Sequence, residues 1–372
     1  MHLETRALLS NSPGTRHELQ VLRYGTPGAA PKAYIQGALH ADEVPAMLVT
    51  RQLQHKLALL EAQGQLRGEI VLVPFANPIG LSQQMLGQHQ GRFDLGDGRN
   101  FNRGFADLSQ AAADTVQDAL GNDAARNTAL IRAALRSAAD ALAPANSADD
   151  LRKQLLALAI DADVVLDLHC DTDAVMHLYA LTEQRAMAEQ LGAALGAQAV
   201  LLATDSGGWP FDEACSRPWQ LLQQHFAGRP IDLACFAATV ELRGEADTSH
   251  VLARRDADGL IDFLRRRGVL ADAPAAPAPQ PLCQATPLAA SEPVTAPCAG
   301  VVVFHRSSGE RVSAGDAIAD LVDPASGSIT TLRCRSDGVM YARCGSRWAH
   351  PGKRLAKIAG TTLSRSGNLL SP

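Results

Sequence analysis

The chain has 372 residues, of which 46% are hydrophobic and 20% are charged. This is the composition of an ordinary globular protein, and the length suits one large domain with a smaller one beside it. Its 34 Lys and Arg residues against 39 Asp and Glu residues give a formal charge of −5. That balance argues against a nucleic acid or an anionic membrane as the main partner, because both require a basic surface.

Short apolar runs alternate with helical patterns over the first 270 residues. The runs are rich in Val, Ile, Leu and Ala, as strands covered on both faces are. The predicted strands are Glu18–Arg23, Ala33–Gln36, Ile70–Phe75, Val164–Leu168, Val175–Ala180, Ala199–Ala203 and Ala234–Leu242, and the predicted helices are Pro45–Ala62, Asn127–Leu142 and Gln184–Leu195. This alternation predicts an α/β fold whose mixed, mostly parallel sheet is flanked by helices.

Three further segments complete the predicted organisation. The Ala-rich stretch Phe105–Lys153 is expected to be a helical insertion, and its role is not evident from the sequence. The run Ala271–Pro281 is rich in proline, which disrupts helices and sheets, so it predicts an extended linker over 271–295 after a first domain of 1–270. Short β-like runs separated by glycine-containing turns then predict a small all-β barrel-sandwich domain over 296–372.

Targeting and redox signals are weak. No stretch of 18 apolar residues is present, and the N-terminus lacks the basic and apolar regions of a signal peptide. The seven cysteines are an odd, scattered set without a C-x-x-C pair. We therefore expect a cytoplasmic protein that is not held in a membrane.

A metal-binding pattern follows two of the predicted strands. His40 and Glu43 lie three residues apart in the turn before a helix, and His169 ends an apolar strand, where α/β sheets place their sites. Two imidazoles and a carboxylate are suitable ligands for a catalytic zinc ion. Asp167 shares the strand parity of His169, so it could accept a hydrogen bond from that imidazole.

Each of these features also has an ordinary structural explanation. His169 alone could be a core histidine, Glu241 could pair with Arg243 at a strand end, and Asn102-Arg103 could belong to a surface loop. The combination at several strand ends favours a metal site. The loop 205–209 could cover a pocket, and Arg243, Asp247 and His250 could line its leaving-group side.

The segments Gly37–Glu43, Asn100–Arg103, Asp167–His169 and Val240–Leu242 together resemble the succinylglutamate desuccinylase/aspartoacylase family, a branch of the zinc carboxypeptidase superfamily. The resemblance covers roughly residues 15–265. It implies a zinc-carboxypeptidase-like fold with one zinc ion per chain. The residues that match the family's zinc ligands are His40, Glu43 and His169.

The same resemblance implies roles for four further residues. Glu241 would activate the attacking water, and Asn102 with Arg103 would hold the carboxylate of the substrate. Arg92 is the candidate for polarising the scissile carbonyl, although Arg99 is an alternative because the spacing from Arg92 to Asn102 is long.

The expected reaction is hydrolysis of the N-acyl amide bond of a small acylated amino acid. A metallocarboxypeptidase acting on short peptides, a zinc esterase and a non-catalytic metal-binding protein are alternatives, although an intact Glu241 argues against the last. The sequence leaves the acyl group, the amine and a possible homo-oligomer undetermined.

The C-terminal segment resembles a biotinyl/lipoyl-type domain in Ala296–Val303, Gly309–Asp316 and Ser336–Tyr341. Such a domain carries its cofactor on a lysine at the tip of a hairpin, here Asp323–Ser328. No lysine occurs from Gly309 to Pro351, and the first after the linker is Lys353. We therefore expect an unmodified domain that packs beside the catalytic mouth or at a subunit contact and narrows access to it.

Overall fold

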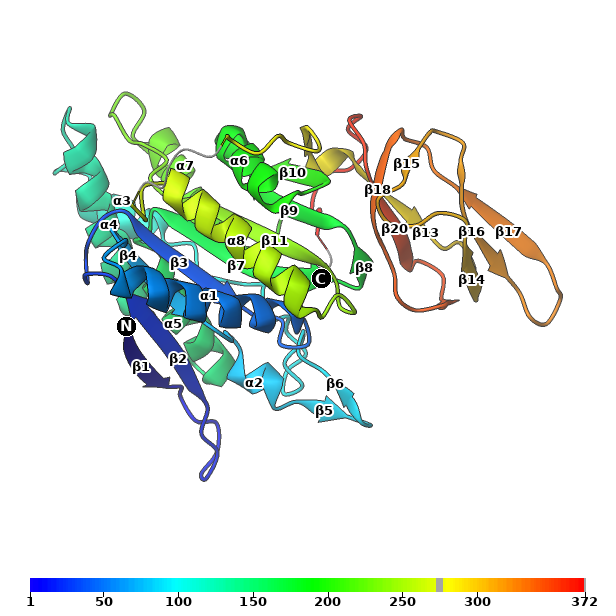
Figure 1. The fold of residues 1–372 in the computed structure, drawn as a ribbon, viewed down its shortest axis with the longest axis horizontal. Coiled ribbons are helices and arrows are strands. Elements are labelled where there is room, and N and C mark those ends of the chain that lie inside the picture. Colours follow the sequence, from blue (N-terminus) through cyan, green and yellow to red (C-terminus); the bar gives the residue numbers. More distant parts are fainter. Residues whose placement is uncertain (272–276, 371–372) are drawn as a thin grey trace.

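A nine-stranded sheet forms the centre of the larger domain in a computed structural model, which describes residues 1–271 and 277–370 (Figure 1). The strands follow the order β1-β2-β4-β3-β7-β11-β9-β10-β12. Their bounds are β1 His2–Ala7, β2 Glu18–Tyr24, β3 Lys32–Gly37, β4 Glu69–Val73, β7 Val164–Asp171, β9 Met176–Leu181, β10 Ala199–Ala203, β11 Phe236–Gly244 and β12 Ala285–Pro287.

The sheet is mixed and mostly parallel, as the sequence predicts. The central neighbours β4–β3, β3–β7 and β7–β11 are parallel, as are β9–β10 and β10–β12. The pairs β1–β2, β2–β4 and β11–β9 are antiparallel. Because β3, β7 and β11 run the same way, their carboxyl ends meet at one edge of the sheet, where His40, His169 and Glu241 follow or end them.

Helices cover both faces of the sheet (Figure 1). One face is covered by α1 Pro45–Ala62, α6 Arg185–Leu195 and α8 His250–Arg266, and the other by α3 Ser109–Val116, α4 Ala124–Asp140, α5 Ser147–Ala159 and α7 Phe211–His225. Each face of the sheet has its own hydrophobic core. Successive side chains of a strand point to opposite faces, so Tyr34 packs into one core and Ile35 into the other. The short elements α2 Pro78–Leu81, β5 Gln84–Met85 and β6 Gln88–His89 lie in the connection after β4.

The segment 105–153, which the sequence suggests is an insertion, contains α3, α4 and the first half of α5. These helices pack against one another and against α7 to complete one hydrophobic core. The segment 105–153 therefore forms part of the helical layer on one face of the large sheet. Helix α5 also contacts the loop 100–103 through Arg152, which donates to Arg103 O and Asn100 O.

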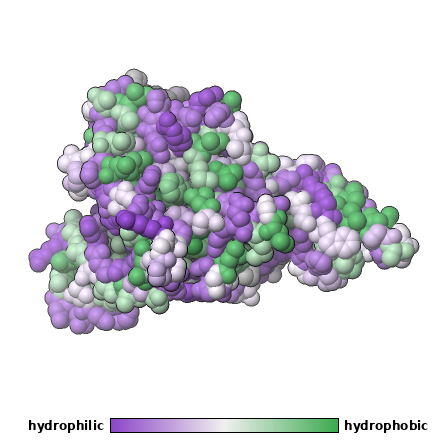
Figure 2. Space-filling view, turned by 90° about the horizontal axis from the view of Figure 1, so that it is seen from below, coloured by the Kyte–Doolittle hydropathy of each residue, from purple (hydrophilic) through white to green (hydrophobic). Residues whose placement is uncertain are grey.

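The C-terminal part consists of two antiparallel sheets, in the orders β13-β20-β18-β15 and β17-β16-β14-β19, packed on a small hydrophobic core. Its strands are β13 Ser291–Thr295, β14 Gly300–Phe304, β15 Arg311–Val312, β16 Ala317–Val322, β17 Ile329–Arg333, β18 Gly338–Arg343, β19 Trp348–Ala349 and β20 Arg354–Ala359. Figure 2 shows that this part projects from the larger domain and that hydrophobic residues gather towards its outer end.

The expected linker of 271–295 contains two strands. Residues 285–287 form β12, which joins the edge of the large sheet beside β10, and residues 291–295 form β13, which pairs with β20. Of the proline-rich run, residues 272–276 lie outside the described residues. Residues 285–287 thus add the last strand to the large sheet, and residues 291–295 add the first strand to the sheet that contains β20.

The two parts meet along a continuous contact. The short strand β8 Asp173–Ala174 follows β7 and pairs with β18. A hydrophobic cluster joins residues of both parts, including Val175, Leu201 and Tyr341. The final described residues return to the larger domain, where Leu369 N donates to Ser206 O at 2.8 Å. Among the residues with described positions, no helix combines the length and apolar character needed to cross a bilayer.

Candidate active site

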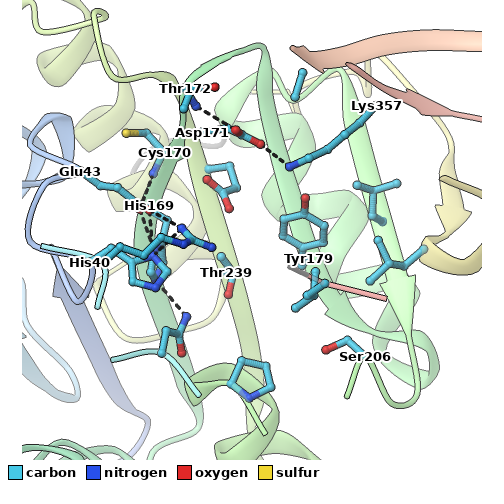
Figure 3. A pocket seen from close by; sticks show the side chains of 18 of the residues that line it. His40, Glu43, His169, Cys170, Asp171, Thr172, Tyr179, Ser206, Thr239 and Lys357 are labelled. Carbon is cyan, nitrogen blue, oxygen red and sulfur yellow. Dashed lines mark hydrogen bonds and ion pairs between the residues drawn. The ribbon is translucent and has the colours of Figure 1, made fainter. Parts of the chain in front are cut away.

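Three buried side chains at the carboxyl edge of the sheet could hold a metal ion. His40 and Glu43 lie in the turn between β3 and α1, and His169 lies near the end of β7 (Figure 3). One ligand atom from each residue lies within 4.8 Å of the others. The turn starts from Ala38, whose positive φ of 58° is unusual for a residue with a side chain and directs the chain into this corner.

The hydrogen bonds around the imidazoles suit a cation. His40 Nε2 lies 2.8 Å from Asn100 Oδ1, whose identity as oxygen is set by a 2.8 Å bond from Asn102 N. His169 Nε2 lies 2.9 Å from Asp167 Oδ2. Both Nε2 atoms therefore donate outwards, which is how proteins orient histidine ligands.

The Nδ1 atoms of the same rings face inwards. They lie 2.8 Å (His40) and 2.7 Å (His169) from the two carboxylate oxygens of Glu43. When the proton of each ring is on Nε2, the lone pair of each Nδ1 faces the Glu43 carboxylate, which is also rich in electrons. A positive charge between these atoms would stabilise the arrangement. The donor set of two imidazoles and one carboxylate thus fits a divalent ion.

The electrostatics of the cluster are strongly perturbed. Burial lowers the pKa of His40. Burial acts in the same direction on His169, but the carboxylates of Asp167 and Glu43 outweigh it and raise the pKa of His169 well above its usual value. Gln36 Nε2 donates to the other Asp167 oxygen at 2.8 Å and so fixes that carboxylate.

Arg92 lies beside the cluster and Arg99 does not. Arg92 Nη1 lies 3.2 Å from Glu43 Oε1 and 3.1 Å from His40 Nδ1. The segment that carries Arg92 packs closely against the turn that carries Glu43. This requires a glycine at position 91, because an added Cβ there would lie 2.1 Å from the backbone N of Asp42. Arg99 is half exposed, pairs with Asp97 and Asp149, and is not among the pocket-lining residues.

Asn102 and Arg103 both line the pocket. Asn102 Oδ1 accepts a hydrogen bond from Phe211 N at 2.8 Å, so the first residue of α7 holds its side chain. Arg152 of α5 supports the same loop from below, with Nε donating to Arg103 O at 2.9 Å and Nη2 to Asn100 O at 3.1 Å. The pair is therefore anchored by two helices of the layer that contains the insertion.

Glu241 lies on β11 directly beside His169 of β7. Its Oε2 is buried without a hydrogen-bond partner among the described residues. Burial, together with the Glu43 carboxylate, raises the pKa of Glu241 to about 8. Arg243 pairs with Asp256 of α8 and makes no ion pair with Glu241 within the described part of the chain.

These residues surround a pocket of about 330 Å³. The C-terminal domain forms one wall, and Lys357 of β20 extends from it to an ion pair of 2.5 Å with Asp171 (Figure 3). Arg243, Asp247 and His250 are absent from the lining, so the expectation that they line the leaving-group side is wrong. Of the loop 205–209, Ser206 lines the pocket and is fully buried.

Sequence reasoning missed several lining residues. Lys357, Tyr179, Asp212 and Glu213 belong to no motif that the sequence revealed. The sequence could have indicated Thr239 as a lining residue, because it lies two residues before Glu241 and so on the same face of β11. Lys357 comes from the other domain, so its position depends on how the two parts pack.

Comparison with solved structures supports the fold over the whole chain. A succinylglutamate desuccinylase/aspartoacylase family protein from Shewanella amazonensis SB2B is 28% identical, covers 96% of this chain and 98% of its own, and superposes with a TM-score of 0.84. A homologue from Shewanella frigidimarina NCIMB 400 is 26% identical, with coverages of 96% and 97% and a TM-score of 0.82. A protein from Rhodobacter sphaeroides at 16% identity, with 96% coverage of both chains and a TM-score of 0.64, shares the fold.

The sequence itself also matches a family model. No curated protein matches the chain. Residues 29–266, which contain the metal-binding cluster, the Asn102-Arg103 loop and Glu241, match the succinylglutamate desuccinylase/aspartoacylase catalytic domain. The chain therefore belongs to the succinylglutamate desuccinylase/aspartoacylase family of hydrolases.

Proposed function

We propose that the protein is a zinc-dependent deacylase that hydrolyses the N-acyl amide bond of a small acylated amino acid. The observation that supports this most strongly is the cluster of His40, Glu43 and His169 within 4.8 Å, at a pocket that also contains Glu241. A general base next to a three-ligand metal site is the arrangement that metal-assisted hydrolysis requires.

Zinc bound by His40, Glu43 and His169 would lower the pKa of water and polarise the scissile carbonyl. Glu241 takes a proton from the attacking water and delivers it to the departing amine. Its pKa of about 8 reflects burial and the nearby Glu43 carboxylate. A metal cation held by Glu43 would lower the pKa of Glu241 and so favour the ionised form that acts as the base.

Arg92 and the Asn102-Arg103 pair have separate tasks in this proposal. The Arg92 guanidinium lies beside the metal-binding cluster, where it stabilises negative charge that develops on the carbonyl oxygen. Arg103 binds the substrate carboxylate, and Asn102 adds its amide to the same group. The residues together orient the amide bond between the metal-binding cluster and Glu241.

The test combines metal analysis with a substrate screen. Purified protein should contain about one zinc ion per chain, and His169→Ala should lose most of it. N-acetyl and N-succinyl amino acids are assayed beside short peptides and esters. Hydrolysis of peptides or esters in preference to every N-acyl amino acid would contradict the proposal.

Glu241→Gln provides the matched control, because it removes the base and retains the side-chain shape. It should keep zinc and the fold but lose turnover by about 10²- to 10⁴-fold. Near-wild-type kcat in this variant would assign the base elsewhere, with Asp171 the next candidate in the pocket.

A further inference from the structure

The segment that follows β20 returns to the larger domain and reaches the pocket (Figure 1). Its Leu370 lines the pocket, and Leu369 is 7% exposed within the hydrophobic cluster that joins the two domains. We propose that residues 364–370 act through the loop 205–209 to position Arg103 for binding the substrate carboxylate. This inference rests on the proposed function, and it assigns part of the carboxylate site to a segment far from the catalytic motifs.

The segment 364–370 is fixed at two points. At its start, Arg365 N donates to Ala289 O at 3.1 Å. Near its end, Leu369 N donates to Ser206 O at 2.8 Å, and Leu369 O accepts a hydrogen bond from the Arg365 guanidinium. The second of these contacts ties the segment to the loop 205–209, and the third fixes the shape of the part that meets this loop.

A glycine of the loop allows the segment to pack closely against it. Gly207 has a φ of +86°, and a Cβ added there would lie 2.3 Å from Asn368 Oδ1 and 3.1 Å from Asn368 Cα. A side chain at 207 would therefore collide with the segment, so this contact requires glycine. Because the two parts are closely packed, a displacement of one shifts the other.

The next residue of the same loop packs against Arg103. A Cβ added to Gly208 would lie 2.9 Å from Arg103 Cδ, and Gly208 O accepts a hydrogen bond from Gly104 N at 2.8 Å. Two consecutive glycines thus contact the segment 364–370 on one side and the chain that carries Arg103 on the other. A guanidinium binds a carboxylate well only in the correct orientation, so this stack of contacts favours substrate binding.

A double-mutant cycle tests the contact between the segment and the loop. Gly207→Ala places a methyl group against Asn368, and Asn368→Ala removes the Oδ1 and Cγ atoms that this methyl group would meet. Gly228→Ala is the matched control, because Gly228 has a similar φ of +91° and its added Cβ would have no neighbour within 4 Å in the described part of the chain. Both glycine variants carry comparable backbone strain, and only Gly207→Ala displaces the segment.

Steady-state kinetics are measured for the N-acetyl or N-succinyl amino acid that the wild type hydrolyses fastest, and for its carboxamide. Gly207→Ala should raise KM for the acid about tenfold and change KM for the amide little, because a displaced guanidinium loses a charge-assisted hydrogen bond to the carboxylate. Adding Asn368→Ala should recover most of this loss. Gly228→Ala should keep the wild-type ratio of the two KM values.

Thermal unfolding of the same variants separates packing from substrate binding. If Gly207→Ala lowers the melting temperature but keeps the wild-type KM ratio, the segment only stabilises the fold and the inference is wrong. Equal changes of the ratio in Gly207→Ala and Gly228→Ala, or no recovery with Asn368→Ala, would also overturn it.

A second variant covers poor folding of Gly207→Ala. Arg365→Met removes the donor to Leu369 O and should change the KM ratio in the same direction, so an unchanged ratio would contradict the inference. Each of these outcomes leaves the deacylase proposal standing, because the wild type remains active. Failure of the wild type to hydrolyse any N-acyl amino acid would instead overturn both proposals.

Discussion

The ring nitrogens of His40 and His169 show how single side chains define this site. Each ring has an acceptor oxygen on its outer side and the Glu43 carboxylate on its inner side. The spacing of His40 and Glu43, and the strand parity of Asp167 and His169, are local properties, so the sequence indicates them directly. Asn100 was not predicted as the partner of His40, because it lies 60 residues away on an irregular loop.

Arg103 offers a test of carboxylate recognition. Arg103→Ala should lower kcat/KM by about 10- to 100-fold for substrates with a free carboxylate, because a charge-assisted hydrogen bond contributes about 1.5–3 kcal/mol. The corresponding amides should change little. Steady-state kinetics on each acid and its amide measure the difference, and Arg99→Ala, outside the pocket, should behave as wild type. Equal losses on both substrates would assign Arg103 a structural role.

We expect His177 to make the stability of the protein depend on pH. It is fully buried, packs against Tyr179 and Tyr341, and its Nδ1 donates to Val175 O at 2.8 Å. Burial lowers the pKa of His177 to about 4 from its usual 6.5. The unfolded chain therefore binds a proton that the folded chain does not, and stability falls as pH drops from 6.5 towards 4.

Replacement of this ring should flatten that dependence. The pKa shift corresponds to about 2 kcal/mol of stability lost between pH 7 and pH 5. His177→Phe keeps an aromatic ring but cannot titrate, so its loss over the same range should be smaller than that of wild type by about this amount. Urea unfolding of both proteins at the two pH values provides the comparison. Parallel losses would show that His177 is not the titrating group.

At the scale of elements, periodicity identified the buried strands and several helices but not every layer. Helix α1 has the predicted bounds, and β10 does as well. Helix α7 was missed because Pro218 lies inside it and proline normally interrupts a helix. The sequence predicts residues 285–287 as linker, because three residues are too few to show a strand period. Their strand pairing depends on β10, which lies far away in the sequence.

Helix α5 supports the active-site loop through Arg152, which is 7% exposed. Arg152→Met retains the apolar stem and removes the donors to Arg103 O and Asn100 O. Leaving buried carbonyls unpaired costs about 1–3 kcal/mol each, so the melting temperature should fall and KM should rise while zinc is retained. Arg126→Met on the exposed face of α4 is the control. A lower melting temperature with unchanged KM would separate the stability role of Arg152 from loop positioning.

At the scale of the whole molecule, the pocket is completed only when the two domains pack together. The pairing of β8 with β18 and the shared hydrophobic cluster fix the β domain beside the carboxyl edge of the large sheet. The resemblance to a biotinyl/lipoyl-type domain suggested a position beside the catalytic mouth. It could not indicate that β20 faces the pocket, because domain orientation depends on contacts that no local sequence pattern contains.

The Lys357–Asp171 ion pair allows a test of how this wall controls access. Lys357→Ala removes a long side chain from the pocket wall, so the ratio of kcat/KM for N-acyl dipeptides to that for N-acyl amino acids should rise. Lys357→Met keeps most of the bulk without the charge and should shift the ratio less. Lys353→Ala, near the same strand but outside the pocket lining, is the matched control. If all three variants keep the wild-type ratio, the β domain does not restrict substrate size through Lys357; if Met and Ala shift it equally, charge and not bulk sets the restriction.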